Sequence, residues 1–481
     1  MKFLESVKSL KYNNIDYNNQ WENAVNIIFI YGGNMTGKFF SRILVFAVLI
    51  AILMVVGISF AEDKQSQTLS REGYTLEQVV VLSRHNIRSP LSGKGSVLGE
   101  ITPHEWFSWS SEASELSTRG GVLETELGQY FRKWLESENF IPENYRPEAN
   151  EVRFYANSKQ RTIATAQYFS SGFLPVANSL IEYHVDYDTM DPVFLPGLTF
   201  VSDAYREYAE AEIRSLYSDK INELFDNYLL LTDVIDMVDS DGFKSGSVAA
   251  FRTDDTELFL NEGEEPAMKG SLKTACSVAD ALVLQYYEEP DKVKAAFGHK
   301  LNDEDWKKIS EIKDLYVDVL FTSPLVSVNV AHPLLQEIRN EMEADGRLFT
   351  FLCGHDSNVG SVLAALDVED YVLPNSIESK TPIGCKVVFT KWSDSEGKDY
   401  WGVDLAYLTP DQLRGMPLLG QGNSPAIFPI SLDGLEQNEA GLYNEADLLG
   451  RFDQAIAAYD TMVEEYADNV LTEVPEPAVA Q

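Results

Sequence analysis

Cysteine is scarce in this chain of 481 residues. There are three cysteines, Cys276, Cys353 and Cys385, so at least one is unpaired and no disulfide framework holds the fold. None of them stands in a CxxC motif or beside other potential ligands. The sequence therefore predicts no structural metal site.

Basic residues are also few, with 38 Lys and Arg against 75 Asp and Glu, which gives a formal net charge of −37. The field of so acidic a protein repels nucleic acid and anionic membranes, and we expect neither as a partner. Any anionic ligand must be held by a local cluster of basic residues. Such a cluster can act because salt screens charges beyond about 8 to 10 Å.

One long apolar run, Ile43 to Ile58, lies near the start of the chain. Two basic residues precede it and small residues follow it up to Ala61, a pattern typical of a secretory signal peptide cleaved after Ala61. An uncleaved membrane anchor is the alternative, although the run is slightly short for a membrane span. Because Met35 would open a compact signal peptide, we expect it to be the true start, and residues 1–34 to be absent from the protein.

The most informative stretch is a buried-strand pattern that breaks into a polar loop. Val79 to Leu82 predict a buried strand, and the loop up to Pro90 contains two arginines around one histidine. Arg84 and Arg88 carry planar donor groups suited to phosphate oxygens, and so close together they would repel each other unless an anion lay between them. His85 can act as a nucleophile, because a neutral imidazole can attack phosphorus. The loop therefore predicts a phosphate pocket that contains a nucleophile.

Two further strand-loop-helix units follow the same pattern. A strand at residues 152–156 leads through a capping turn at residues 157–158 to Arg161, which lies where a helix begins and its free N–H groups favour an anion. A third strand, at residues 348–353, leads to His355 and Asp356 just before another helix. A capping role would explain Asp356 but not His355. Ligands bind beyond the carboxyl ends of parallel strands, so we expect these loops to meet in one site.

Strands that alternate with helices predict an α/β fold, a mostly parallel sheet with helices on both faces. We expect a catalytic domain formed by residues 62–195 and 291–469, followed by a disordered tail at residues 470–481. Residues 196–290 show long helical segments without a buried-strand pattern, which predicts an inserted helical cap. Substrate-selecting residues are common in such segments, so Glu210 is a candidate substrate contact, although an exposed helical charge is the simpler interpretation.

These motifs resemble those of the histidine acid phosphatases. RHxxRxP stands at residues 84–90 and the HD pair at residues 355–356, and segments such as TMDPVF, LQYYE, LFTSP and KTPIGC extend the resemblance over most of residues 74–465. The resemblance implies a phosphoglycerate-mutase-like fold. Asn86 stands where most of the family has glycine, a feature shared by the branch of the family that hydrolyses glucose 1-phosphate in the periplasm.

The resemblance also implies a two-step hydrolysis of a phosphomonoester. His85 would attack phosphorus, and Asp356 would protonate the leaving alcohol and then activate water against the phosphohistidine, which predicts an acidic pH optimum. Four basic side chains would hold the phosphate oxygens and stabilise the transition state, those of Arg84, Arg88, Arg161 and His355. No metal or other cofactor is needed, since the guanidinium groups supply the positive charge.

We expect the substrate to be a sugar phosphate similar to glucose 1-phosphate. The enzyme would be periplasmic, a monomer or homodimer, and free of stable membrane association after signal cleavage. A phytase, which acts on inositol hexakisphosphate, is the first alternative, and the acidic cap disfavours so highly charged a substrate. A non-catalytic sugar-phosphate-binding protein is the second alternative. His85 together with Asp356 disfavours it, since binding alone needs only the arginines.

Overall fold

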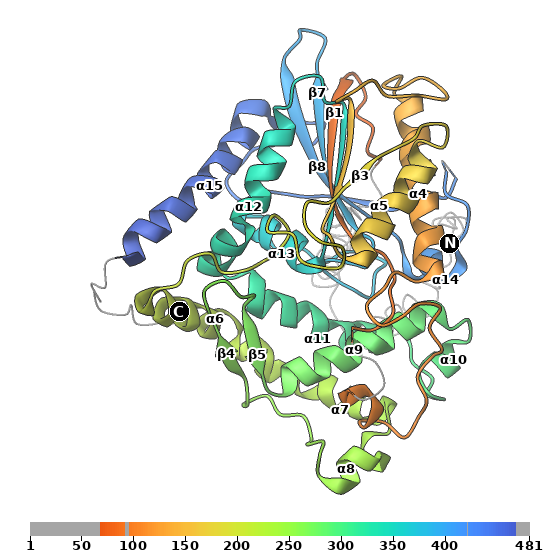
Figure 1. Cartoon of the computed structure of the whole chain (residues 1–481), viewed down its shortest axis with the longest axis vertical. Helices are drawn as coiled ribbons and strands as arrows, with labels where there is room; N and C mark the ends of the chain where they lie inside the picture. Colours follow the sequence, from red (N-terminus) through yellow and green to blue (C-terminus); the bar gives the residue numbers. More distant parts are fainter. Residues whose placement is uncertain (1–67, 92–95, 421, 468–481) are drawn as a thin grey trace, which may run out of the picture. The chain divides into compact units, whose positions relative to one another are not determined.

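An eight-stranded sheet forms the centre of the structure, a computed structural model that describes residues 68–91, 96–420 and 422–467. The strands lie in the order β10-β8-β7-β1-β6-β2-β3, and β9 also pairs with β8 (Figure 1). They are β1 (Thr75–Arg84), β2 (Val152–Ala156), β3 (Ile181–Glu182), β6 (Phe349–Gly354), β7 (Lys386–Ser393), β8 (Asp399–Tyr407), β9 (Ala426–Pro429) and β10 (Tyr443–Asn444).

The sheet is mixed and mostly parallel, as predicted. β6 pairs in parallel with both β1 and β2, and β2 pairs in parallel with β3. β7 pairs antiparallel with β1, and β8 antiparallel with β7, so β8 again runs in the direction of β1. Five of the eight strands (β1, β2, β3, β6 and β8) therefore share one direction. The three predicted site loops all follow strands of this set, and their residues lie toward one edge of the sheet.

Helices cover both faces of the sheet, which is also as predicted. Alternate residues of β1 enter different apolar clusters, with Val79 and Val81 in one and Val80 and Leu82 in the other. This alternation is the period of a strand whose two faces are both buried. The first cluster includes residues of α4 (Thr118–Ser137) and α5 (Gln160–Phe173), and the second includes residues of α12 (Pro324–Met342), α13 (Asp356–Ala365) and α15 (Glu445–Ala467).

A helical layer lies beyond one end of the sheet, as expected for a cap (Figure 1). It contains α6 (Asp203–Glu223), α7 (Phe225–Val234), the short 3-10 helix η2 (Met237–Asp239), α8 (Asp241–Ser245) and α9 (Ser271–Glu288), and α10 (Lys292–Ala295) and α11 (Asp303–Phe321) continue it. Two short elements, the 3-10 helix η1 (Val97–Gly99) and α14 (Pro410–Gly415), contact α9 of this layer.

The cap also contains a small two-stranded sheet, formed by β4 (Glu257–Phe259) and β5 (Ala267–Lys269), which the sequence pattern did not predict. Strands of three residues are too short to show a clear alternation of apolar and polar side chains. The described residues pack as one compact unit, so the domain limits at residues 195 and 290 stay predictions. The predicted signal peptide, start site and tail fall outside the described residues.

Candidate active site

The last residue of β1, Arg84, and the loop that follows it, with His85 and Arg88, lie in the interior, where none of the three is more than 5% exposed. The backbone of this loop is fixed from both neighbouring strands. The N–H of Arg84 donates to the carbonyl of Cys385 over 2.9 Å, and the N–H of His85 donates to the carbonyl of Gly354 over 3.0 Å. The loop therefore starts from a defined position at the carboxyl end of β1.

His85 lines a cavity and uses one ring nitrogen to bind the backbone. Its Nδ1 lies 2.9 Å from the carbonyl oxygen of Asn86. A carbonyl oxygen only accepts hydrogen bonds, so Nδ1 carries the proton and Nε2 keeps its lone pair. Burial lowers the pKa of His85 well below its usual value, and the charges of Arg161 and Arg88 lower it further. The ring is thus neutral, the form in which imidazole is a nucleophile.

Arg161 and His355 meet at the same cavity although they are 194 residues apart. The amide of Asn157 donates from Nδ2 to Nε2 of His355 over 2.7 Å, while its Oδ1 accepts from the N–H of Asp191. Nε2 is therefore an acceptor, and the proton of His355 lies on Nδ1, which is 3.3 Å from Nη2 of Arg161. Two donors that lie side by side in this way suit a phosphate oxygen that accepts from both.

Arg161 lies in the first turn of α5, where the sequence placed it. The predicted capping turn at residues 157–158 is wrong, because Lys159 is the N-cap and makes no side-chain capping bond. The side chain of Asn157 turns to His355 instead. Burial lowers the pKa of Arg161 to about 10, and the neighbouring Arg88 contributes to this shift. Arg161 therefore stays charged at neutral and acidic pH, and the crowding of positive charge favours an anion.

Asp356 is the first residue of α13, and its Oδ2 accepts from Nη2 of Arg84 over 3.0 Å. Burial raises the pKa of Asp356, but Arg84, Arg88 and Lys313 outweigh burial and hold the pKa below its usual value. The carboxyl group is therefore ionised in this state. Its use as an acid requires that substrate phosphate first neutralise these cations, which raises the pKa of Asp356 in the complex.

A chain of ionic contacts, which the sequence did not predict, links Arg84 to Arg88. Oε1 of Glu378 accepts from Arg84 over 3.1 Å and from Lys313 over 3.0 Å. Lys313 lies 3.5 Å from Asp280, whose other oxygen accepts from Arg88 over 3.0 Å. Each arginine thus has a carboxylate partner, so the expected repulsion between them is relieved without an anion, contrary to the sequence analysis.

The site residues gather around a cavity of about 390 Å³ between the sheet and the helical layer. Side chains from α9 and α11 form its other wall. Five of the predicted site residues line it, namely His85, Arg88, Arg161, His355 and Asp356. Arg84 is not among the lining residues and contacts the site through Asp356. Glu210 lies on α6 and does not line the cavity either, so its position gives no support to a substrate contact.

The carboxylates that the cap does bring to the cavity are Glu265 and Asp280. Glu265 belongs to the loop between β4 and β5, and Asp280 to α9. Sequence reasoning had no signal for either, because acidic residues are frequent throughout the cap and only the tertiary structure singles out two of them.

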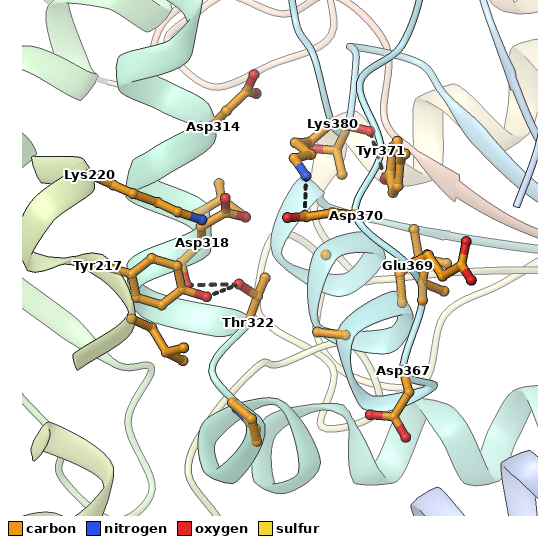
Figure 2. A pocket seen from close by; sticks show the side chains of 18 of the residues that line it. Tyr217, Lys220, Asp314, Asp318, Thr322, Asp367, Glu369, Asp370, Tyr371 and Lys380 are labelled. Carbon is orange, nitrogen blue, oxygen red and sulfur yellow. Dashed lines mark hydrogen bonds and ion pairs between the residues drawn. The ribbon is translucent and has the colours of Figure 1, made fainter. Parts of the chain in front are cut away.

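A second cavity, of about 430 Å³, lies on another side of α11 (Figure 2). Its lining is rich in carboxylates, including Asp314, Asp318 and Asp370, and Figure 2 shows Asp370 bound to Lys380. Among the described residues that line it there is no arginine or histidine. In residues 68–467, apart from the short stretches left undescribed, no group of three or more histidine, cysteine or acidic side chains is arranged to hold a metal ion. The cavity at His85 is therefore the candidate active site.

Known proteins are similar to this chain in both sequence and fold. The model of the histidine phosphatase superfamily (branch 2) matches residues 75–245. A glucose-1-phosphatase of Salmonella typhimurium is 38% identical over 390 residues, which cover 80% of this chain and 94% of that protein. A glucose-1-phosphatase of Providencia rettgeri is 36% identical over 373 residues, which cover 76% of this chain and 88% of that protein.

Among solved structures, the phytase from Citrobacter braakii matches with a TM-score of 0.69 and 25% identity, covering 80% of this chain and 98% of that chain. The family predicted from the RHxxRxP and HD motifs is confirmed: the chain belongs to the histidine phosphatase superfamily, branch 2.

Proposed function

We propose that this protein hydrolyses sugar phosphomonoesters such as glucose 1-phosphate through a covalent phosphohistidine. The observation that carries the proposal is the state of His85, a buried neutral imidazole whose proton is held on Nδ1 by Asn86 and whose ring lines the cavity. Binding alone would not need a nucleophile in this form. Arg88, Arg161 and His355 surround it with donors for the phosphate oxygens.

The reaction proceeds in two displacements at phosphorus. Nε2 of His85 attacks, the bond to the sugar oxygen breaks, and Asp356 gives its proton to that oxygen. Water then attacks the phosphohistidine while Asp356 takes the proton, and phosphate leaves as the bond to Nε2 breaks. The resting Asp356 is ionised, so the proton for the first displacement enters with a monoanionic substrate, which is abundant only below about pH 6. Turnover is therefore fastest in acid.

The substrate class follows from the charges around the cavity. Beyond the phosphate-binding donors, the cap brings the carboxylates of Glu265 and Asp280 to the cavity together with the ammonium group of Lys273, and Lys313 is already held by Glu378. A sugar with a single phosphate directs hydroxyl groups toward these carboxylates. Inositol hexakisphosphate would bring further negative charge against them, and like charges across an interface disfavour binding. A hexose phosphate is also of a size that suits a cavity of about 390 Å³.

We also propose that the enzyme is exported to the periplasm, with the segment ending at Ala61 as its cleaved signal, and that it is a monomer or homodimer. The support is the basic, apolar and small-residue order of residues 35–61. Among the described residues no single helix is long and apolar enough to cross a membrane, and the one pair that meets this condition together, α11 and α12, is bent by 84°. Amino-terminal sequencing of the secreted protein tests the cleavage site.

The function is tested by assaying the secreted protein on three substrates between pH 3 and 8 in the presence of a chelator. We expect hydrolysis of glucose 1-phosphate and p-nitrophenyl phosphate with an acidic optimum, and much slower hydrolysis of inositol hexakisphosphate. His85→Ala should lower kcat by at least about 1,000-fold, because no other group can form the intermediate. Activity that survives His85→Ala, or that requires added metal, contradicts the mechanism. Faster hydrolysis of the hexakisphosphate identifies a phytase.

A further inference from the structure

Behind the nucleophile, Asn86 makes four hydrogen bonds in a fully buried position. Its carbonyl accepts from Nδ1 of His85 over 2.9 Å, and its N–H donates to the hydroxyl of Thr165 over 3.2 Å. Its side-chain Oδ1 accepts from the N–H of Ile87 over 2.8 Å, and Nδ2 donates to Glu124 over 2.6 Å. The peptide group between residues 86 and 87 is thus held at its carbonyl by His85 and at its N–H by the Asn86 side chain.

The side chain of Asn86 is held in turn by a buried ion pair. Oε1 of Glu124 accepts from Asn86 and also from Nζ of Lys386 over 3.0 Å, and neither Glu124 nor Lys386 is exposed. Lys386 completes its hydrogen bonding with Ser83 and the carbonyl of Gly384. The start of β7, the loop after β1 and the helix α4 therefore meet behind residue 86, although they are distant in the sequence.

Gly384 packs closely against the side chain of Asn86. Its φ of +71° lies in the left-handed region that favours glycine, and a Cβ at this position would lie 2.5 Å from Nδ2 of Asn86. Its N–H donates to the carbonyl of His85 over 3.1 Å. The segment before β7 thus leaves room for an asparagine at position 86 and also binds the nucleophile's own backbone.

We propose that Asn86, Glu124 and Lys386 form a positioning network that fixes the peptide between residues 86 and 87 and, through it, the tautomer and orientation of His85. This inference rests on the proposed function, in which His85 is the nucleophile. None of the three side chains lines the cavity or touches the reacting atoms. If the peptide turned away, Nδ1 would lose the acceptor that the carbonyl of Asn86 provides, and a proton on Nε2 would remove the lone pair that attacks phosphorus.

A purely structural ion pair is the competing explanation, and the chain provides a matched control. Arg71 and Asp404 form another buried pair, 2.7 Å apart, with side chains 6% and 0% exposed. It lies on β8 and the segment before β1, away from the cavity lining. Asp404→Asn therefore reproduces the loss of a buried carboxylate without disturbing the peptide after Asn86.

The test compares Asn86→Gly, Glu124→Gln and Asp404→Asn in the secreted protein, with p-nitrophenyl phosphate as the probe. Asn86→Gly and Glu124→Gln should lower kcat and the single-turnover rate of phosphohistidine formation by about 10-fold to 100-fold, with KM within about twofold, because attack depends on sub-ångström placement. Asp404→Asn should lower the melting temperature but keep kcat within about twofold. Losses of kcat no larger than those of Asp404→Asn overturn the positioning role.

Two further measurements separate positioning from folding. In spectra of protein with ¹⁵N-labelled histidine, assigned by comparison with His85→Ala, wild-type His85 should show protonated Nδ1, and Asn86→Gly a mixture of tautomers. The double variant Asn86→Asp with Glu124→Gln exchanges donor and acceptor while keeping the net charge, and should be faster than either single variant. The network is contradicted if His85 keeps a single tautomer in Asn86→Gly, or if the double variant is no faster than the single variants. Full activity of His85→Ala would instead refute the proposed function.

Discussion

Asp356 has to carry a proton in the first displacement and to lack one in the second, and its cationic neighbours decide when each state exists. In the structure Arg84 lies 3.0 Å from its carboxylate, and Arg84, Arg88 and Lys313 together outweigh burial and lower its pKa. The bound substrate phosphate, which enters as a monoanion, reduces that positive potential. The proton therefore becomes more tightly held only once substrate is present, which couples proton donation to binding.

This coupling predicts a leaving-group effect for Asp356→Asn. Without a proton donor, departure of a sugar alkoxide of high pKa is strongly slowed, whereas p-nitrophenolate leaves without help. We expect phosphohistidine formation from glucose 1-phosphate to fall by about 100-fold to 10,000-fold, and formation from p-nitrophenyl phosphate by much less. Rapid-quench measurement of the phosphorylated enzyme tests this. Asp370→Asn, a change in the second cavity, is the control, and equal losses for both substrates would refute the acid role.

At the scale of elements, the β4–β5 hairpin brings the cap to the reaction site. The loop between its strands is tied to the segment before α6, since the N–H of Leu198 donates to Glu264 and the N–H of Gly263 donates to Leu198. These bonds fix the position of Glu265, whose side chain lines the cavity. Because Glu265 is itself exposed, the hairpin places it at the mouth, where the sugar rather than the phosphate would lie.

Glu265→Gln should therefore affect the sugar and leave the phosphate chemistry intact. We expect the KM for glucose 1-phosphate to rise by about 5-fold to 20-fold, because a hydrogen bond to a charged acceptor contributes about 1 to 2 kcal/mol more than a hydrogen bond to a neutral one. The KM for p-nitrophenyl phosphate should stay within about twofold. Glu262→Gln, in the same hairpin loop but outside the cavity lining, is the matched control. Equal effects of both variants, or on both substrates, would argue against a sugar contact.

At the scale of the whole molecule, the sequence predicted the parts of the site that follow strands. His85 and its two arginines form a local motif directly after a buried strand, and the loops of Arg161 and His355 follow two more strands of the same sheet. Since parallel strands end at one edge, their convergence was predictable without a structure. The direction of β7, β9 and β10, which run opposite to β1, was not predictable, because strand direction depends on how the connections pack.

The supporting residues of the site were beyond the reach of sequence patterns. Asp280, Lys313 and Glu378 come from α9, α11 and a loop, and each looks like an ordinary polar residue in its own segment. Asn86 was recognised only as a departure from glycine, and its contacts with Glu124 appear only in the folded chain. Tertiary packing selects these partners, so local periodicity carries no information about them.

Asp314 lies at the wall of the second cavity (Figure 2). Its raised pKa predicts how the stability of the whole molecule depends on pH. Burial raises its pKa to about 7, and Glu378 adds to the shift, although Ser379 donates to its carboxylate over 2.8 Å. The unfolded chain releases this proton near pH 4. The folded state thus binds more protons between about pH 4 and pH 7, so this residue makes the free energy of unfolding fall as pH rises through that range.

Asp314→Asn removes this titration while keeping an oxygen that can accept from Ser379. At pH 7.5 the variant should gain up to about 4 kcal/mol of stability, seen as a melting temperature a few degrees above wild type. At pH 4 the variant and the wild type should have the same melting temperature, since the wild-type carboxyl is then protonated in the folded state. Asp367→Asn, which alters another carboxylate of the same cavity, should show no such pH-dependent gain. Melting curves that stay parallel from pH 4 to 7.5 would place the pKa of folded Asp314 near its usual value.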